Sequence, residues 1–258
     1  MELNKQAFLA AWEAAAPHLQ QDALMQSEWW GEMTLPGIFA TLEEALTSVT
    51  TVEGLFARLI NKPEPGIILY AALLVLRTLV DPATQPTTQL ARERTITSDT
   101  ALVIFGNATI SGTVQNNGAL IVFGDLTIEG IYGDEAWGYS VLAVGGSVRA
   151  RGVISFGDML IGGDLLVSEV VHGWYNDNSL LVGGTLRTRV LLKEYHHTQY
   201  AALEAQETMD IFQDIPRLRE LFVDDLFIEK ERNGEIEVEF DTGLLFERLE
   251  QGQQIYRS

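Results

Sequence analysis

The chain has 258 residues, of which 17 are basic and 36 acidic, so its formal net charge is −19. Phosphate contacts need positive surface, and this balance therefore disfavours binding to nucleic acids or to anionic membranes. The absence of cysteine excludes disulfides, thiolate nucleophiles and cysteine-ligated metals. The same negative field attracts and steers a basic protein partner, although acidity also serves solubility alone.

Residues 1–92 predict a helical region that packs on or caps the segment that follows. Phe8 and Trp12 lie four residues apart, which is the spacing of an amphipathic helix. The apolar run 67–76 is closed by Arg77 and is too short to span a bilayer. The first residues lack the basic stretch and apolar core of a signal peptide, so we expect a cytoplasmic protein.

Residues 93–200 contain five related segments, each with a strand, a glycine turn and a second strand. Their aligned glycines are Gly106, Gly124, Gly146, Gly163 and Gly184, which are 18, 22, 17 and 21 residues apart. A turn-rich, strand-like repeat of about 20 residues is typical of a β-solenoid in which each repeat forms one coil. We therefore predict a mainly β protein built on a parallel β-helix of about five coils.

The columns of the repeat indicate which side chains point inward, because positions two apart share a face of a strand. Apolar residues fill the inward columns on both sides of the glycine turn. Those columns include Ile104, Val122, Val144, Ile161 and Val182, and then Ala108, Leu126, Val148, Leu165 and Leu186. The residues that flank the second strand are mostly polar, so its outer face is expected to be solvated.

The first strand of each repeat also has an apolar outward column. It consists of Val103, Ile121, Ala143, Leu160 and Leu181. A strand that is apolar on both faces is normally buried on both, and a bare apolar stripe of this size promotes association. We expect the N-terminal helices to cover this column; a second copy of the chain is the alternative.

Residues 201–258 predict an acidic cap made of a helix, a hairpin and a second helix. Residues 201–221 have helical character, and Asn233-Gly234 is a strong two-residue hairpin signal. In the strand after this turn, apolar residues alternate with glutamates, so one face packs and the other carries a row of carboxylates. The alternating residues are Glu235, Ile236, Glu237, Val238, Glu239 and Phe240. This region holds 15 acidic and 6 basic residues, a net charge of −9.

The turn glycines, aspartates and histidines of the repeat region favour structural rather than catalytic interpretations. A phosphate loop needs a glycine turn that opens a helix, whereas each turn here leads into another strand. Asp125 and Asp164 share a column two coils apart, about 10 Å at a strand spacing of about 4.8 Å. That distance slightly exceeds the spacing of about 6.5–9.5 Å used by inverting glycosidases. Adjacent histidines on a strand, such as His196 and His197, point to opposite faces and are therefore poorly placed to bind one metal ion. From these observations together we expect no catalytic residue, cofactor or metal.

The connections between coils alternate in length, and the long ones are rich in aromatic and acidic residues. Insertions at equivalent points of stacked coils emerge at one edge, which is often the binding surface. We predict that this edge binds a protein partner through Tyr132, Asp134, Glu135, Trp137, Tyr139, His172, Trp174, Tyr175 and Asp177. The alternative is that these rings fold back onto the solenoid or an end cap.

The run Val122-Phe123-Gly124-Asp125-Leu126-Thr127-Ile128-Glu129-Gly130 and its four relatives resemble the coils of bactofilins, the polymer-forming bacterial β-helix family. The resemblance covers about 90 of the 258 residues. It implies a right-handed β-helix without catalytic residues. Unlike those proteins, which have short tails, this chain has long flanking regions that are expected to cap the solenoid ends and block a filament.

These features favour a non-enzymatic, acidic protein that binds a basic protein partner. An immunity protein that neutralises a basic, nuclease-type toxin fits the charge and the lack of catalytic groups, and it would be a monomer or small homo-oligomer. The alternative is a self-associating, bactofilin-like cytoskeletal or scaffold protein. A polysaccharide-cleaving hydrolase on the same fold is a third, less favoured reading.

Overall fold

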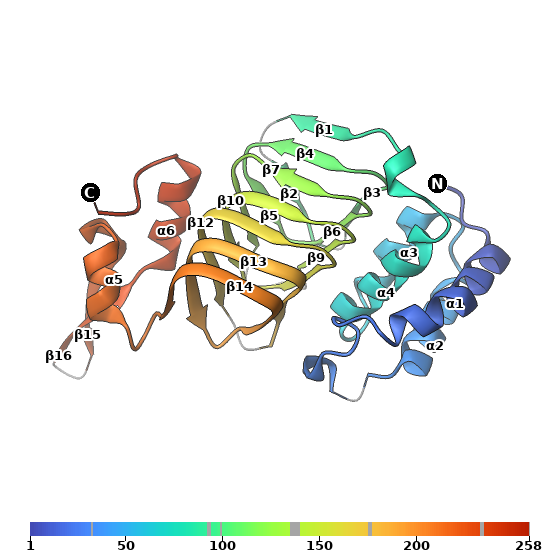
Figure 1. The fold of residues 1–258 in the computed structure, drawn as a ribbon, viewed down its shortest axis with the longest axis horizontal. Helices are drawn as coiled ribbons and strands as arrows, with labels where there is room; N and C mark the ends of the chain where they lie inside the picture. Colours follow the sequence, from blue (N-terminus) through green and yellow to red (C-terminus); the bar gives the residue numbers. More distant parts are fainter. Residues whose placement is uncertain are drawn as a thin grey trace.

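The computed structural model describes residues 1–31, 33–91, 94–98, 100–134, 140–174, 177–232 and 235–257. It confirms the predicted fold class. A parallel β-solenoid stands between a group of N-terminal helices and a C-terminal part that contains helices and a two-stranded antiparallel sheet (Figure 1).

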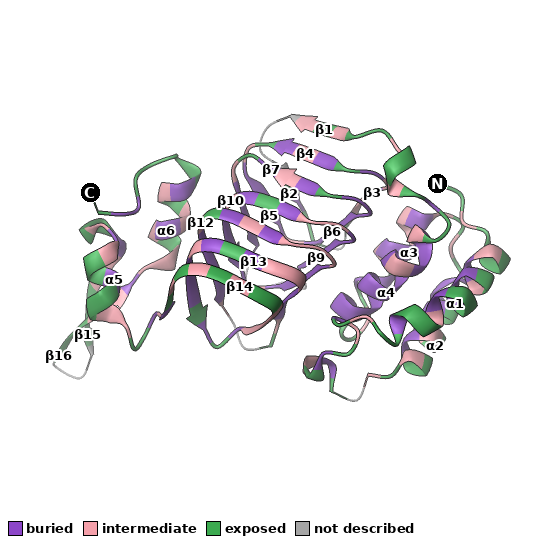
Figure 2. Ribbon diagram, viewed as in Figure 1, coloured by how far each residue is buried: buried purple, intermediate pink, exposed green. Residues whose placement is uncertain are grey.

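The N-terminal region contains four helices. They are α1 (Lys5–Leu19), α2 (Leu35–Ala45), α3 (Val52–Leu59) and α4 (Pro65–Arg77), with short helical turns at Glu28–Trp30 and Pro82–Thr84. The apolar run 67–76 lies in α4, which packs between the other helices and the solenoid and is almost entirely buried (Figure 2). A helix that is enclosed on all sides is apolar on all sides, which accounts for that run.

The solenoid extends beyond the predicted segment at both ends, from residue 88 to residue 210, and makes about six turns. Its strands are β1 (Thr88–Ala91), β2 (Arg94–Ile96), β3 (Ala101–Ile104), β4 (Ala108–Ser111), β5 (Val114–Asn116), β6 (Ala119–Val122), β7 (Leu126–Ile128), β8 (Ile131–Asp134), β9 (Val141–Val144), β10 (Val148–Ser155), β11 (Asp158–Ile161), β12 (Leu165–Trp174), β13 (Ser179–Glu194) and β14 (His197–Asp210). The pairs between these strands are parallel, as expected for successive coils.

Each coil contributes three strand segments, so the solenoid has three faces. The open face is formed by β1, β4, β7 and the parts of β10, β12, β13 and β14 that begin at 148, 165, 185 and 202. The cap face is formed by β2, β5, β8 and the ends of β10, β12, β13 and β14, and the helix face by β3, β6, β9, β11 and the starts of β13 and β14. The sequence repeat revealed only two of these faces.

The interior confirms the predicted apolar columns. Ile104, Val122, Val144, Ile161 and Val182 are register partners on successive coils and belong to the buried core of the solenoid. A further inward column, on the cap face, comprises Val114, Tyr132, Val153, Val171 and Leu191.

The residues after the turn glycines form a ladder of hydrogen bonds between coils. The side chain of Asn107 accepts the backbone N–H of Asp125 at 2.8 Å, and Asp125 accepts that of Ser147 at 2.8 Å. Ser147 Oγ accepts the N–H of Asp164 at 3.0 Å, and Asp164 accepts that of Thr185 at 2.7 Å. Each side chain satisfies a backbone donor of the next coil, which supports the structural interpretation of Asp125 and Asp164.

The N-terminal helices cover the apolar outward column, as predicted. Ile121, Ala143, Leu160 and Leu181 are fully buried in one cluster with residues of all four helices, and Val103 packs partly buried against it. Hydrophobic burial on both sides of the helix face therefore joins the helices to the solenoid.

The C-terminal part differs from the prediction at its start. Residues 201–210 were expected to be helical but belong to β14, because their backbone pairs with β13 along the last coil. The elements that follow are α5 (Ile215–Leu221), a short turn at Asp224–Leu226, β15 (Phe227–Arg232), β16 (Glu235–Phe240) and α6 (Thr242–Glu250).

The flanking regions lie beside the solenoid rather than on its ends (Figure 1). The N-terminal helices therefore pack on the solenoid, which is one of the two predicted arrangements, whereas the expectation that the flanking regions cap its ends is wrong. Ile131, Ile154 and Val190 on the cap face share a buried cluster with Leu245 and Leu249 of α6. The physical reason is that the outward-facing apolar residues of the coils lie on two side faces of the solenoid. Burying them stabilises the contact of each flanking region with one of these faces.

Within the described ranges, no helix combines the length and the apolar character that crossing a lipid bilayer requires.

Candidate partner-binding cleft

Three residues of the predicted binding edge lie inside the molecule. Tyr132 and His172 are 0% exposed and Asp134 is 5% exposed, so the prediction that they contact a partner is wrong. The segments that contain them are cap-face strands, β8 and β12, rather than projecting insertions. Of the other predicted residues, Trp174 is partly buried and Asp177 is exposed.

Glu135, Trp137, Tyr139 and Tyr175 lie outside the described residues.

Asp134 is held in a network of buried hydrogen bonds. Its carboxylate accepts the hydroxyls of Tyr132 at 3.1 Å and Ser155 at 3.0 Å, and the backbone N–H groups of Phe156 and Gly157. Burial raises the pKa of Asp134 to about 6, and these donors oppose the rise. The network closes a corner of the coil and accounts for the polar residues there without a catalytic role.

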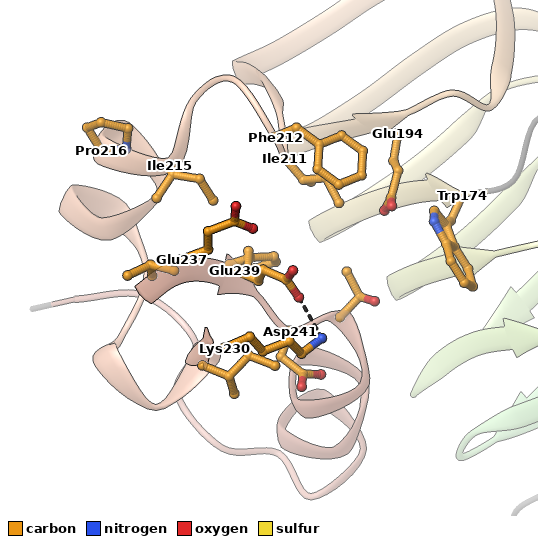
Figure 3. Close-up of a pocket in the computed structure, with 14 residues that line it drawn as sticks. Trp174, Glu194, Ile211, Phe212, Ile215, Pro216, Lys230, Glu237, Glu239 and Asp241 are labelled. Atoms are coloured by element: carbon orange, nitrogen blue, oxygen red, sulfur yellow. Dashed lines mark hydrogen bonds and ion pairs between the residues drawn. The ribbon is translucent and has the colours of Figure 1, made fainter. Parts of the chain in front are cut away.

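A cleft of about 770 Å³ lies between the last coils of the solenoid and the C-terminal part (Figure 3). It is lined by Trp174, Glu194, Ile211, Phe212, Ile215, Pro216, Ile228, Lys230, Glu237, Val238, Glu239, Phe240, Asp241 and Thr242. Its walls therefore combine aromatic and aliphatic side chains with carboxylates, and Trp174 is the one residue among them that both was predicted and lies in the described ranges.

The hairpin β15–β16 forms one wall through the alternation of its side chains. Lys230 pairs in register with Glu237, and Ile228 with Glu239, so these four residues share one face of the hairpin. The opposite face packs its aromatic residue Phe240 into the C-terminal core. The predicted packed face is thus confirmed at Phe240, whereas Ile236, which was predicted to share it, is 71% exposed.

The opposite wall is the corner where the last coils leave the cap face. Trp174 ends β12 and Glu194 ends β13, and the two are register partners on adjacent coils. The Trp174 ring packs edge-on against Phe156, with centroids 4.5 Å apart. In Figure 3 both side chains lie on the side of the cleft opposite Glu237 and Glu239.

The cleft is electrostatically negative. The described lining residues include four carboxylates, those of Glu194, Glu237, Glu239 and Asp241, and one ammonium, that of Lys230. That ammonium is bound to Glu239 at 2.5 Å, and Asp241 caps α6 by accepting the N–H of Leu244 at 3.0 Å. Carboxylates gathered around apolar walls suit a ligand that is cationic and partly apolar.

Besides these carboxylates and Lys230, the described lining residues include one hydroxyl, that of Thr242. The described part of the chain also holds no group of three or more His, Asp or Glu side chains placed to bind a metal. His196 instead bonds the Trp174 carbonyl oxygen at 3.0 Å, and the His197 ring stacks on Trp29.

Sequence reasoning missed Glu194 and Phe212 as members of this site. The row of glutamates in β16 was predicted from the sequence. Residues 201–210 were predicted to be helical, so the prediction did not include a last strand that brings the chain back past Trp174. The alternation of Leu203 and Ala205 with polar residues was the available signal for a strand.

No family model, curated protein or solved structure matches the chain.

Proposed function

We propose that this protein is a non-enzymatic binding protein of the cytoplasm that sequesters a basic protein in the cleft between its solenoid and its C-terminal part. An immunity protein against a basic, nuclease-type toxin is the form of this function that best suits the chain. Its formal net charge of −19 favours a basic partner over a nucleic acid.

The observation that carries the proposal is the composition of the cleft. Four carboxylates, one of them Glu194 in the solenoid wall, surround a cavity whose other walls are aromatic and aliphatic. Protein interfaces are typically anchored by residues that bury apolar area and pair with charges of opposite sign. A loop of a basic protein that carries cationic and apolar side chains matches both properties.

Survival of cells that co-express the chain with a basic toxin encoded beside it tests this proposal. The wild-type chain is expected to rescue growth, and Glu237→Lys is expected to reduce rescue because it places a cation in the cleft wall. Glu129→Lys, at an exposed residue that follows β7 and does not line the cleft, makes the same charge change and serves as the control. Killing that is equal with and without the wild-type chain contradicts the proposal.

A self-associating scaffold is the second candidate, and the ends of the solenoid favour it. Among the described strands, β1 pairs only with β4, and β14 only with β13. Such edges present unpaired N–H and C=O groups that can template another chain. The exposed Glu204 on β14 opposes this contact between like copies, because charged edge residues discourage pairing.

A further inference from the structure

Glu194 is a buried carboxylate that has no lysine or arginine partner among the described residues. It is 7% exposed and lines the cleft from the end of β13. Its carboxylate is hydrogen-bonded to His172, whose Nε2 lies 3.1 Å from Glu194 Oε2. No lysine or arginine in the described ranges lies within 4.0 Å of its carboxylate. Burying a charge is costly unless it is paired, so this carboxylate is poised to gain from a cation.

His172 fits its pocket as a neutral ring that donates to Glu194. The ring is 0% exposed, and its Nδ1 has no hydrogen-bond partner. A doubly protonated ring would bury a second N–H without an acceptor, which costs free energy. With the proton on Nε2, His172 orients Glu194 and leaves its negative charge uncompensated.

Trp174 provides the second element of a cation site. It is the register partner of Glu194 on the adjacent coil, and adjacent strands lie about 4.8 Å apart. Its ring is fixed by the edge-on contact with Phe156. A carboxylate beside an indole suits a guanidinium, which can form hydrogen bonds to the carboxylate and stack on the ring.

We propose that Glu194 and Trp174 form an anchor site for an arginine side chain of the bound protein. This inference rests on the proposed function, because it identifies the group that the cleft recognises. Arginine is preferred to lysine because the planar guanidinium uses both partners at once. Glu237 on the hairpin wall adds favourable charge to the same cleft.

Titration with short peptides tests the anchor directly. The probes are the acetylated, amidated tetrapeptide Gly-Phe-Arg-Gly and the same peptide with citrulline, which has the shape of arginine without its charge. Binding is followed by calorimetry and by the Trp174 indole N–H resonance, assigned with Trp174→Phe. The arginine peptide is expected to bind at least about tenfold more tightly than the citrulline peptide.

Glu194→Gln isolates the charge, because glutamine keeps the size of the side chain and an oxygen that accepts the His172 N–H. It is expected to weaken binding of the arginine peptide by at least about tenfold, whereas Glu129→Gln, at an exposed residue outside the cleft lining, leaves binding unchanged. An unchanged amide spectrum shows that each variant is folded. Equal binding of arginine and citrulline peptides, equal binding by Glu194→Gln, or no binding at millimolar concentration overturns the proposal.

The two proposals fail separately. If the basic toxin is neutralised and Glu194→Gln neutralises it equally well, the anchor is wrong and the proposed function stands. If the arginine peptide binds at Glu194 and the toxin is not neutralised, the anchor stands and the proposed function is wrong.

Discussion

Gly66 is a residue at which the backbone of α4 lies close to the solenoid. A Cβ atom there would lie 2.5 Å from Asp158 Oδ2 and 3.0 Å from Asp158 Cβ. Asp158 cannot easily move, because its Oδ1 accepts both the N–H and the hydroxyl of Ser179 at 3.0 Å. The absence of a side chain at this position therefore lets the helix dock.

Gly66→Ala is expected to lower the free energy of unfolding by about 1–3 kcal/mol through this overlap. Gly37→Ala is the matched control near the start of α2, where the new Cβ would meet only Thr34 Oγ1 at 3.4 Å. That change is expected to be neutral or stabilising by about 0.5 kcal/mol. Urea unfolding measures both, and equal stabilities of the two variants would count against this docking contact.

Asp158 also makes stability depend on pH. Burial raises its pKa to about 7, assisted by the charges of Glu64 and Asp134 and opposed by the hydrogen bonds from Ser179. A carboxyl whose pKa is higher in the folded state than its unfolded value of about 4 binds its proton more tightly when folded. This contribution to stability is complete below about pH 4 and is lost as pH rises through about 7.

Asp158→Asn is expected to flatten this dependence, because the amide keeps an acceptor for Ser179 and never ionises. Compared with the wild type, the variant gains relative stability between pH 5 and pH 8, the window set by the raised pKa of Asp158. Thermal unfolding at the two pH values gives the comparison. A wild-type to variant difference that does not change with pH shows that Asp158 does not ionise in this window.

At the scale of elements, the repeat made the coil interior predictable. The positions of Val122 and Leu126 are apolar in all five segments, because side chains at these positions pack inside the coil. The cap-face strands were missed because they vary in length and carry buried polar residues such as Asp134 and His172. Local composition marked them as loops, whereas pairing with neighbouring coils makes them strands.

The cleft was predictable only in part, again because pairing between coils overrides the structure that local composition indicates. The carboxylate row of β16 and the aromatic character of Trp174 were visible in the sequence. Their meeting depends on β14 continuing the solenoid to Asp210 before the chain turns to α5. Residues 201–210 have helix-compatible composition, and the tertiary pairing with β13 overrides it.

Leu160 tests how strongly the helices are joined to the helix face. It is 0% exposed and packs in the cluster that the N-terminal helices share with the solenoid. Leu160→Ala is expected to lower the free energy of unfolding by about 2–5 kcal/mol. Leu166→Ala removes the same atoms on the open face, where the side chain is only partly buried, and should cost much less. Equal losses measured by urea unfolding argue against the helices as the main cover.

For the whole molecule, the distribution of charge matters more than any single ion pair. Residues 201–258 carry a net charge of −9 of the total −19, and the hairpin wall of the cleft belongs to this region. Affinity for a basic partner is therefore expected to fall as salt is raised from about 0.05 M to about 0.5 M, mainly through slower association. Stopped-flow binding measures it; a salt-independent association rate contradicts electrostatic steering.

In the proposed function, the chain acts as a discrete binder of a basic protein. Light scattering after size-exclusion chromatography distinguishes this from self-assembly, with the chain alone over a hundredfold concentration range and then mixed with a basic, nuclease-type toxin. The expected result is a small species of fixed mass that becomes heavier by the mass of the partner. A mass that grows with concentration, together with no heavier species in the mixture, would contradict the claim and favour a self-assembling scaffold.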